Sequence, residues 1–137
     1  MATRVDRASQ RSVLVVEDDS TMREVLCELL RDEGYRTRAA STMAQARKRL
    51  AEETPSVLML DLELPDGSAV ELLRELGDRT SAPPTMLLTG DLEARSTARR
   101  FGIPVVTKPR IRGLLTTVAR TADERPRPRR HSRPSRL

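Results

Sequence analysis

Four short apolar segments along the chain each end in polar side chains. The segments cover residues 13–16, 57–60, 85–88 and 105–106, and the polar residues after them are Glu17-Asp18-Asp19, Asp61, Thr89 and Thr107-Lys108. Unbroken runs of Val, Leu and Met are typical of strands that are buried on both faces, as in parallel sheets. Such sheets bind ligands at the carboxyl ends of their strands, so we expect these polar groups to share one site.

The segments between these strands carry helical periodicity. After a strand over 12–16, apolar residues from Met22 to Leu30, Val25 included, fall on one helical face, with Ser20 as the expected N-cap and Gly34 as the stop. A weaker alternation over 35–40 predicts an edge strand. Further helices are predicted from Ser41 or Thr42 to about Thr54 and over 68–77, 91–101 and 110–121, with a loop at 64–67.

Five successive strand–helix units predict an α/β fold. The expected architecture is a doubly wound sandwich, with a five-stranded parallel sheet, right-handed crossovers and helices on both faces. We expect one domain over residues 12–123, after a flexible polar lead at 1–11. The Arg/Pro-rich tail at 124–137 has too few apolar residues to bury a core, so we expect it to be disordered.

The composition narrows the cellular context. The net charge of +5 comes from the two ends, because residues 13–124 hold 16 basic and 19 acidic side chains. The single cysteine, Cys27, excludes an intramolecular disulfide and is expected to be a packing residue. No apolar run approaches the roughly 18 residues of a membrane span, so we expect a cytoplasmic protein with no membrane partner.

Three carboxylates are expected to crowd together in this fold. Glu17 and Asp18 end the first strand and Asp61 ends the third, and these strands are neighbours in a doubly wound sheet. Their mutual repulsion costs stability unless a hard cation relieves it. Mg²⁺ prefers carboxylate and carbonyl oxygens together with water. Asp19 has a simpler explanation, because an acid at a helix N-terminus favours the helix dipole.

Two other groups suit a phosphoryl group beside these acids. Thr89 closes the fourth strand, and Lys108, one of only two lysines, closes the fifth. A hydroxyl and a compact ammonium at this edge would stabilise the oxygens of a phosphoryl group on Asp61.

Together these motifs resemble the receiver domain of two-component response regulators. The matching pieces are Val15 to Ser20, Leu60-Asp61, Leu64 to Gly67, Leu88-Thr89-Gly90 and Thr107-Lys108-Pro109. The resemblance implies a flavodoxin-like (βα)5 fold with strand order 2-1-3-4-5. It also implies that Asp61 accepts a phosphoryl group from a phosphohistidine on a sensor histidine kinase or a histidine phosphotransfer protein.

The resemblance also implies roles for single residues. Asp18, Asp61 and the main-chain carbonyl of Glu63 would bind Mg²⁺ directly, and Glu17 would reach the metal through water. Thr89 and Lys108 would contact the phosphoryl group. Such a domain is no enzyme beyond its own phosphorylation and dephosphorylation, and we expect a stand-alone receiver with output through protein contact or phosphoryl relay.

One position departs from the family pattern. Many receivers carry Tyr or Phe three residues before the lysine, where this chain has Val105; Tyr35 and Phe101 are its only aromatic residues. The ring is not needed for phosphorylation. The departure leaves open how a signal would pass from Asp61 to the surface around residues 90–106.

Three alternatives stay open at this point. A haloacid-dehalogenase-type phosphatase also forms an aspartyl phosphate, but Glu63 is a poor match to its second acid, and turnover of a phosphate ester would identify it. A pseudo-receiver would bind partners without phosphorylation. A nucleic-acid binder would use the arginine-rich tail through phosphate charge alone, although the tail has no aromatic residues for base stacking, and salt-dependent DNA binding would identify it.

Overall fold

The computed structural model of the chain describes residues 11–77, 82–89, 94–107 and 111–123. Its strands are β1 (Ser12–Val16), β2 (Arg36–Ala40), β3 (Val57–Asp61), β4 (Glu63–Leu64), β5 (Gly67–Ser68), β6 (Thr85–Thr89) and β7 (Val105–Thr107). Its helices are α2 (Ser20–Asp32), α3 (Met43–Glu52), α4 (Ala69–Gly77), α5 (Ala94–Phe101) and α6 (Ile111–Ala122). The predicted lead, apart from Arg11, and the predicted disordered tail lie outside the described residues.

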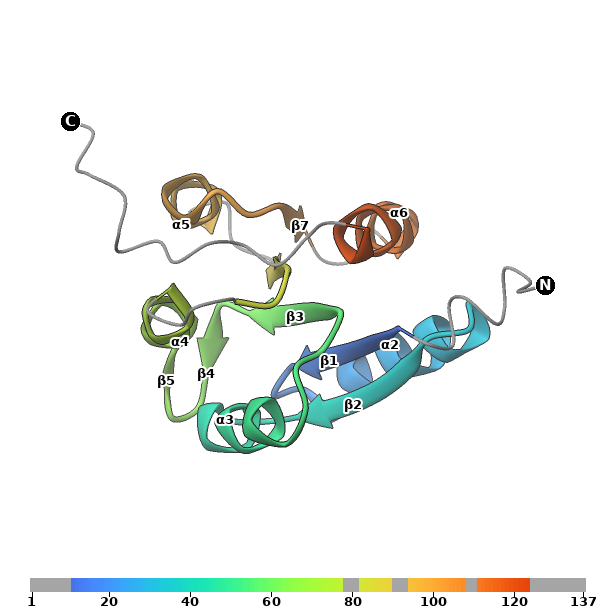
Figure 1. The fold of residues 1–137 in the computed structure, drawn as a ribbon, viewed down its shortest axis with the longest axis horizontal. Coiled ribbons are helices and arrows are strands. Elements are labelled where there is room, and N and C mark those ends of the chain that lie inside the picture. Colours follow the sequence, from blue (N-terminus) through green and yellow to red (C-terminus); the bar gives the residue numbers. More distant parts are fainter. Residues whose placement is uncertain (1–10, 78–81, 90–93, 108–110, 124–137) are drawn as a thin grey trace.

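The main sheet confirms the predicted architecture. Its order is β2-β1-β3-β6-β7, and every pair in it is parallel. Because β4 and β5 form a separate antiparallel pair, this order corresponds to the predicted 2-1-3-4-5, with β2 at the edge. Helices α3, α4 and α5 cover one face of the sheet, and α2 and α6 cover the other (Figure 1).

Alternate residues of the central strands supply the two halves of the core. Leu14 and Leu58 face α3 and α4, whereas Val15 and Met59 face α2 and α6. All four side chains are fully buried. Burial of one such side chain contributes about 1.5–3 kcal/mol, so an unbroken apolar run is stabilised on both faces of the sheet.

The structure corrects three details of the expected elements. The N-cap of α2 is Asp19 rather than Ser20, because the Met22 N–H donates to Asp19 Oδ1 at 3.1 Å. Val25, expected on the apolar face, is 41% exposed. The loop expected at residues 64–67 is a hairpin in which Leu64 belongs to β4 and Gly67 to β5, so the turn itself is limited to Pro65 and Asp66.

The hairpin turn is attached to the start of α3 through Asp66. Its carboxylate accepts hydrogen bonds from the backbone N–H groups of Met43 (2.7 Å) and Ala44 (3.1 Å). These are unsatisfied donors of the first helical turn, so the carboxylate joins the local N-cap, Thr42, in satisfying them. Gly67 has a φ of +147°, and a Cβ at this position would lie 2.7 Å from the Met43 Sδ, so both conformation and space favour glycine there.

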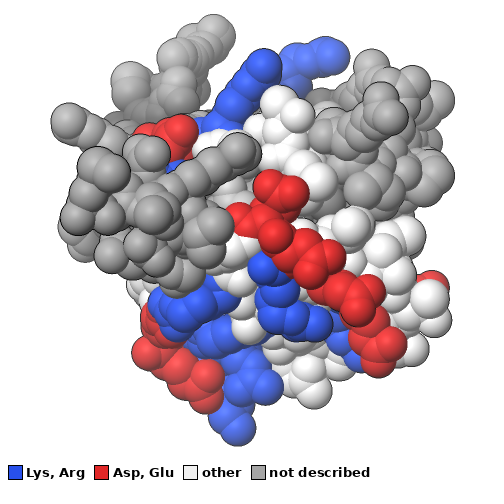
Figure 2. Space-filling model, turned by 90° about the vertical axis from the view of Figure 1, so that its right-hand side faces the viewer, with Lys and Arg blue, Asp and Glu red and all other residues white. Residues whose placement is uncertain are grey.

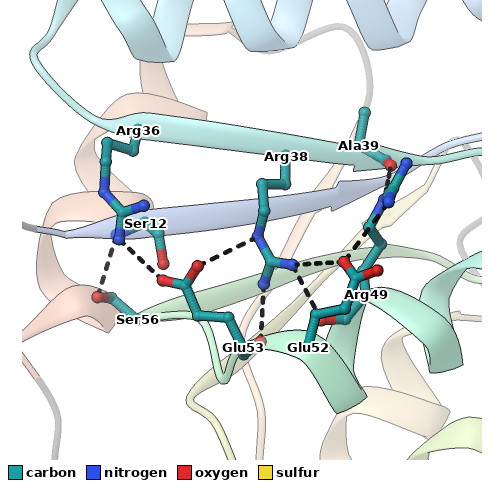
Figure 3. Close-up of polar contacts among 8 residues, drawn as sticks. All are labelled: Ser12, Arg36, Arg38, Ala39, Arg49, Glu52, Glu53 and Ser56. Atoms are coloured by element: carbon teal, nitrogen blue, oxygen red, sulfur yellow. Dashed lines mark hydrogen bonds and ion pairs between the residues drawn. The ribbon is translucent and has the colours of Figure 1, made fainter.

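The charged side chains on the surface are arranged differently on the side of α2 and α6 and in the region of β2 and α3. Figure 2 shows the side of the molecule on which α2 and α6 lie, crossed by a diagonal row of acidic side chains. Near β2 and α3, by contrast, arginines and glutamates form ion pairs with one another (Figure 3). Within the part of the chain that the structure describes, no helix is long and apolar enough to cross a membrane.

Arg38 joins the edge strand β2 to the C-terminal end of α3. Its guanidinium donates to the main-chain carbonyls of Arg49 (2.9 Å) and Glu53 (2.7 Å), and its side chain is 20% exposed (Figure 3). These carbonyls belong to the last turn and C-cap of the helix, where acceptors lack intrahelical partners and the helix dipole favours a cation. Through these hydrogen bonds Arg38 attaches the edge strand β2 to α3, although β2 has few apolar side chains of its own.

We predict that Arg38→Ala lowers the free energy of unfolding by about 1.5–3 kcal/mol, since partly buried carbonyls would lose charged hydrogen-bond donors. The control is Arg36→Ala on the same strand. Arg36 is 54% exposed and pairs with Glu53 at 2.8 Å. An exposed pair of this kind contributes at most about 1 kcal/mol. Urea denaturation of both variants measures the difference, and equal losses would contradict the proposed role of Arg38.

A second prediction concerns acid stability. Hydrogen bonds from the backbone of Met43 lower the pKa of Asp66 below its ordinary value of 3.8. A group whose pKa is depressed on folding stabilises the fold above its unfolded pKa, and this contribution is lost as the pH falls through the folded pKa. We expect Asp66→Asn to lower stability at neutral pH and to reduce the pH dependence below 3.8, as measured by urea denaturation at several pH values. An unchanged pH profile would contradict the prediction.

Candidate functional site

The structure brings together three of the predicted carboxylates. One oxygen each of Glu17, Asp18 and Asp61 lies within 4.8 Å of the others. The strand register explains this proximity, because Val16 of β1 lies opposite Leu60 of β3, so the next residue of each chain segment is acidic. Glu17 and Asp61 are 1% and 8% exposed, whereas Asp18 is exposed.

The loop after β1 is fixed by bonds within the site. The Glu17 N–H donates to the Ala40 carbonyl at 3.0 Å, which continues the pairing toward β2. The Asp19 N–H donates to Glu17 Oε2 at 3.1 Å. Arg23 of α2 donates to the Glu17 carbonyl at 2.8 Å. The backbone on both sides of Asp18 is therefore anchored to β2 and α2.

Arg23 is a residue that the sequence did not single out. It donates to the main chain rather than to a carboxylate, so its positive charge lies beside the acidic cluster while its hydrogen bonds fix the loop. No sequence signal could have identified it, because arginine accounts for almost all of the basic residues in this chain.

The remaining predicted residues are placed only in part. Thr89 is the last residue of β6 and lies opposite Thr107 of β7, at the same edge of the sheet as Asp61. The main chain of Glu63 forms β4 and pairs with Ser68. The side chains of Thr89 and Glu63, and all of Lys108, lie outside the described part of the chain.

The donor set is suited to a hard divalent cation. Oxygens from three carboxylates meet around one point, and two of these groups are almost completely shielded from water. Mg²⁺ and Ca²⁺ take oxygen ligands of this kind, whereas softer metals prefer nitrogen and sulfur. The site could therefore hold Mg²⁺, which would offset the repulsion between the acids.

Comparison with known proteins identifies the family. The family model described as the response regulator receiver domain matches residues 13–119. The chain belongs to the response regulator receiver domain family. Its acidic pocket lies where a receiver domain has its phosphorylation site, and receiver domains generally act as signalling modules rather than as enzymes.

Two curated relatives illustrate how much of a longer protein is matched. The receiver domain is 32% identical over 119 residues to the response regulator protein PilR of Pseudomonas aeruginosa, covering 82% of this chain and 27% of PilR. It is 33% identical over 104 residues to the phosphate regulon transcriptional regulatory protein PhoB of Escherichia coli, covering 72% of this chain and 45% of PhoB. The chain thus spans less than half the length of these relatives.

Solved structures give the same fold. A putative response regulator from Chloroflexus aurantiacus superposes with a TM-score of 0.76 at 26% identity, covering 83% of this chain and 98% of that one. The response regulator TrrA from Thermotoga maritima, solved in complex with Mg²⁺-BeF, superposes with a TM-score of 0.74 at 27% identity, covering 81% and 98%. Both comparisons agree with the doubly wound fold found here.

We predict that MgCl₂ raises the unfolding temperature of the receiver domain but not that of Asp18→Asn or Asp61→Asn. Ligand at 100 times its dissociation constant stabilises the folded state by about 2.7 kcal/mol. Without metal, Asp61→Asn should unfold at a higher temperature than the wild type, because one of the repelling charges is removed.

Differential scanning calorimetry with and without Mg²⁺ measures both effects. The control is Glu71→Gln, which removes an exposed acid on α4 and should leave the Mg²⁺ response intact. An equal Mg²⁺ response in Asp18→Asn and the wild type would show that the three carboxylates do not form the metal site.

Proposed function

We propose that Asp61 is the phosphoacceptor of this receiver domain and takes its phosphoryl group, with Mg²⁺, from a phosphohistidine on a sensor histidine kinase or a histidine phosphotransfer protein. The observation that carries the proposal is the juxtaposition of Asp61 with Glu17 and Asp18 within 4.8 Å at the end of a central strand. Asp61 is 8% exposed, so its carboxylate is accessible from a narrow range of directions.

The proposed reaction is a phosphoryl transfer between two side chains. A carboxylate oxygen of Asp61 forms a bond to phosphorus while the bond from phosphorus to the histidine nitrogen breaks, and the electron pair of that bond returns to the imidazole. Glu17, Asp18, Asp61 and the Glu63 carbonyl are the proposed Mg²⁺ ligands. When bound, Mg²⁺ supplies positive charge to the phosphoryl oxygens.

Thr89 and Lys108 are the proposed contacts of the phosphoryl group itself. The hydroxyl of Thr89 would donate a hydrogen bond to a phosphoryl oxygen, and the ammonium of Lys108 would neutralise part of the negative charge of the phosphoryl oxygens. The position of Thr89 beside β7, at the edge of the sheet where Asp61 lies, supports this assignment.

The output of the domain is proposed as protein contact or phosphoryl relay. Residues 12–123 would form the functional unit. The only reactions that this unit would catalyse are its own phosphorylation and dephosphorylation.

Val105 is half-buried and packs against the core that α3, α4 and α5 share with the sheet. A small aliphatic side chain therefore occupies the place where many receivers have a movable ring.

The central prediction is tested with acetyl phosphate. In the presence of Mg²⁺, intact mass spectrometry should show the addition of one phosphoryl group to the wild type and none to Asp61→Asn, because the carboxamide of asparagine is a much weaker nucleophile than the carboxylate that it replaces. Removal of Mg²⁺ with a chelator should suppress the labelling of the wild type.

The matched control is Asp19→Asn, which removes an acid next to the site but keeps a good N-cap for α2. This variant should be labelled like the wild type. Failure of acetyl phosphate to label the folded wild type would favour a pseudo-receiver, and equal labelling of Asp61→Asn would place the phosphoryl group on another residue.

A further inference from the structure

The outer face of α2 carries acids at a regular spacing. Glu24, Glu28 and Asp32 are exposed and follow one another every four residues, which places them in one row along the helix. Val25 on the same face is 41% exposed and is the large apolar side chain that the described part of the chain leaves most open. The face therefore offers both negative charge and an apolar contact.

These acids have no ion-pair partner among the described residues. Some acids elsewhere on the described surface do have one: Glu53 pairs with Arg36, and Glu75 pairs with Arg47. The three acids of α2 differ from these because they follow one another along a single helix and none of them has such a partner.

The arginines that lie near this row are already engaged. Arg23 donates to the main chain of the loop after β1, and Arg31 donates to Thr37 Oγ1 at 3.1 Å. Arg36 pairs with Glu53. The sequence of residues 124–137, in contrast, contains six arginines and only one acid, Glu124.

The described chain ends close to the C-terminal end of α2. Helices α2 and α6 pack on the same face of the sheet and contribute to one core. Asp123, directly after α6, pairs with Arg11 at 2.7 Å, and the Arg11 carbonyl accepts a hydrogen bond from the N–H of Arg36, which follows α2 by four residues. Residue 124 is therefore connected to the body of the domain near Asp32.

We propose that the arginine-rich segment 124–137 docks along the outer face of α2. Its length is sufficient, because an extended proline-rich segment advances roughly 3.1 Å per residue, whereas α2 with its 13 residues is about 20 Å long.

The covalent connection favours this contact over one with a separate molecule. Single exposed ion pairs are weak and are screened by salt. A short tether, however, gives the attached segment an effective concentration in the millimolar range, so several weak pairs suffice.

The contact is tested by paramagnetic broadening in the full-length, unphosphorylated chain, so the result does not depend on the proposed function. A nitroxide is attached to Ser135→Cys. The native Cys27 is 7% exposed and burial raises its pKa, which favours labelling of the introduced thiol. The unsubstituted chain treated in the same way is the blank.

We expect the amide signals of residues 20–24, at the end of α2 toward which the docked segment would run, to lose at least about half of their intensity, and those of α3 and α4 on the opposite face to keep theirs. About 1 M NaCl, with a Debye length near 3 Å, should restore the lost intensity. The combined variant Glu24→Gln, Glu28→Gln, Asp32→Asn should restore it as well.

A matched control removes the same number of charges elsewhere, through Glu52→Gln, Glu71→Gln and Glu75→Gln, and should leave the broadening of α2 unchanged. Broadening that is spread over the whole domain, or that survives neutralisation of the three α2 acids, would overturn the proposal. An absence of α2 broadening together with salt-dependent binding of a short DNA duplex would assign the segment to nucleic acid instead.

Discussion

The repulsion between three carboxylates at one edge of the sheet is the constraint around which this domain is organised. Glu17, Asp18 and Asp61 meet within 4.8 Å because the parallel register of β1 and β3 leaves no other place for the residues that end these strands. Crowding of like charges costs stability, and a bound cation would offset that cost. The stability of the apolar sheet therefore holds together acids that repel one another.

The scaffold keeps this arrangement in place largely through main-chain hydrogen bonds. Arg23 holds the loop that carries Asp18, and Asp66 joins the hairpin after Asp61 to the first turn of α3. Arg38 plays the corresponding part at the other end of α3. Hydrogen bonds from charged groups to main-chain atoms are stronger than exposed ion pairs between two flexible side chains. The loop after β1, the β4–β5 hairpin and the end of α3 are therefore each held by one charged side chain.

The sheet and the acidic cluster were predictable from the sequence, because an apolar run followed by an acid is a local signal and strand order in such folds is narrowly constrained. The details that were missed have two causes. Asp19 and Ser20 are both good N-cap residues, so the local sequence did not decide between them for α2. The hairpin around Gly67 is held by tertiary contacts of Asp66 with Met43 and Ala44, more than twenty residues away. The role of Arg23 could not be distinguished among so many arginines.

The two acidic regions of the domain require cations of different shape. In the pocket, carboxylate oxygens lie close enough together for one compact ion, since Mg²⁺ binds its ligands at about 2.1 Å. Along α2, acids four residues apart are separated by about 6 Å of helix, which is too far for a single ion to bind all of them. Separate guanidinium groups suit such a row better, because each of them can pair with one carboxylate. The geometry of the acids, more than their number, thus determines which cation each region of this protein can bind.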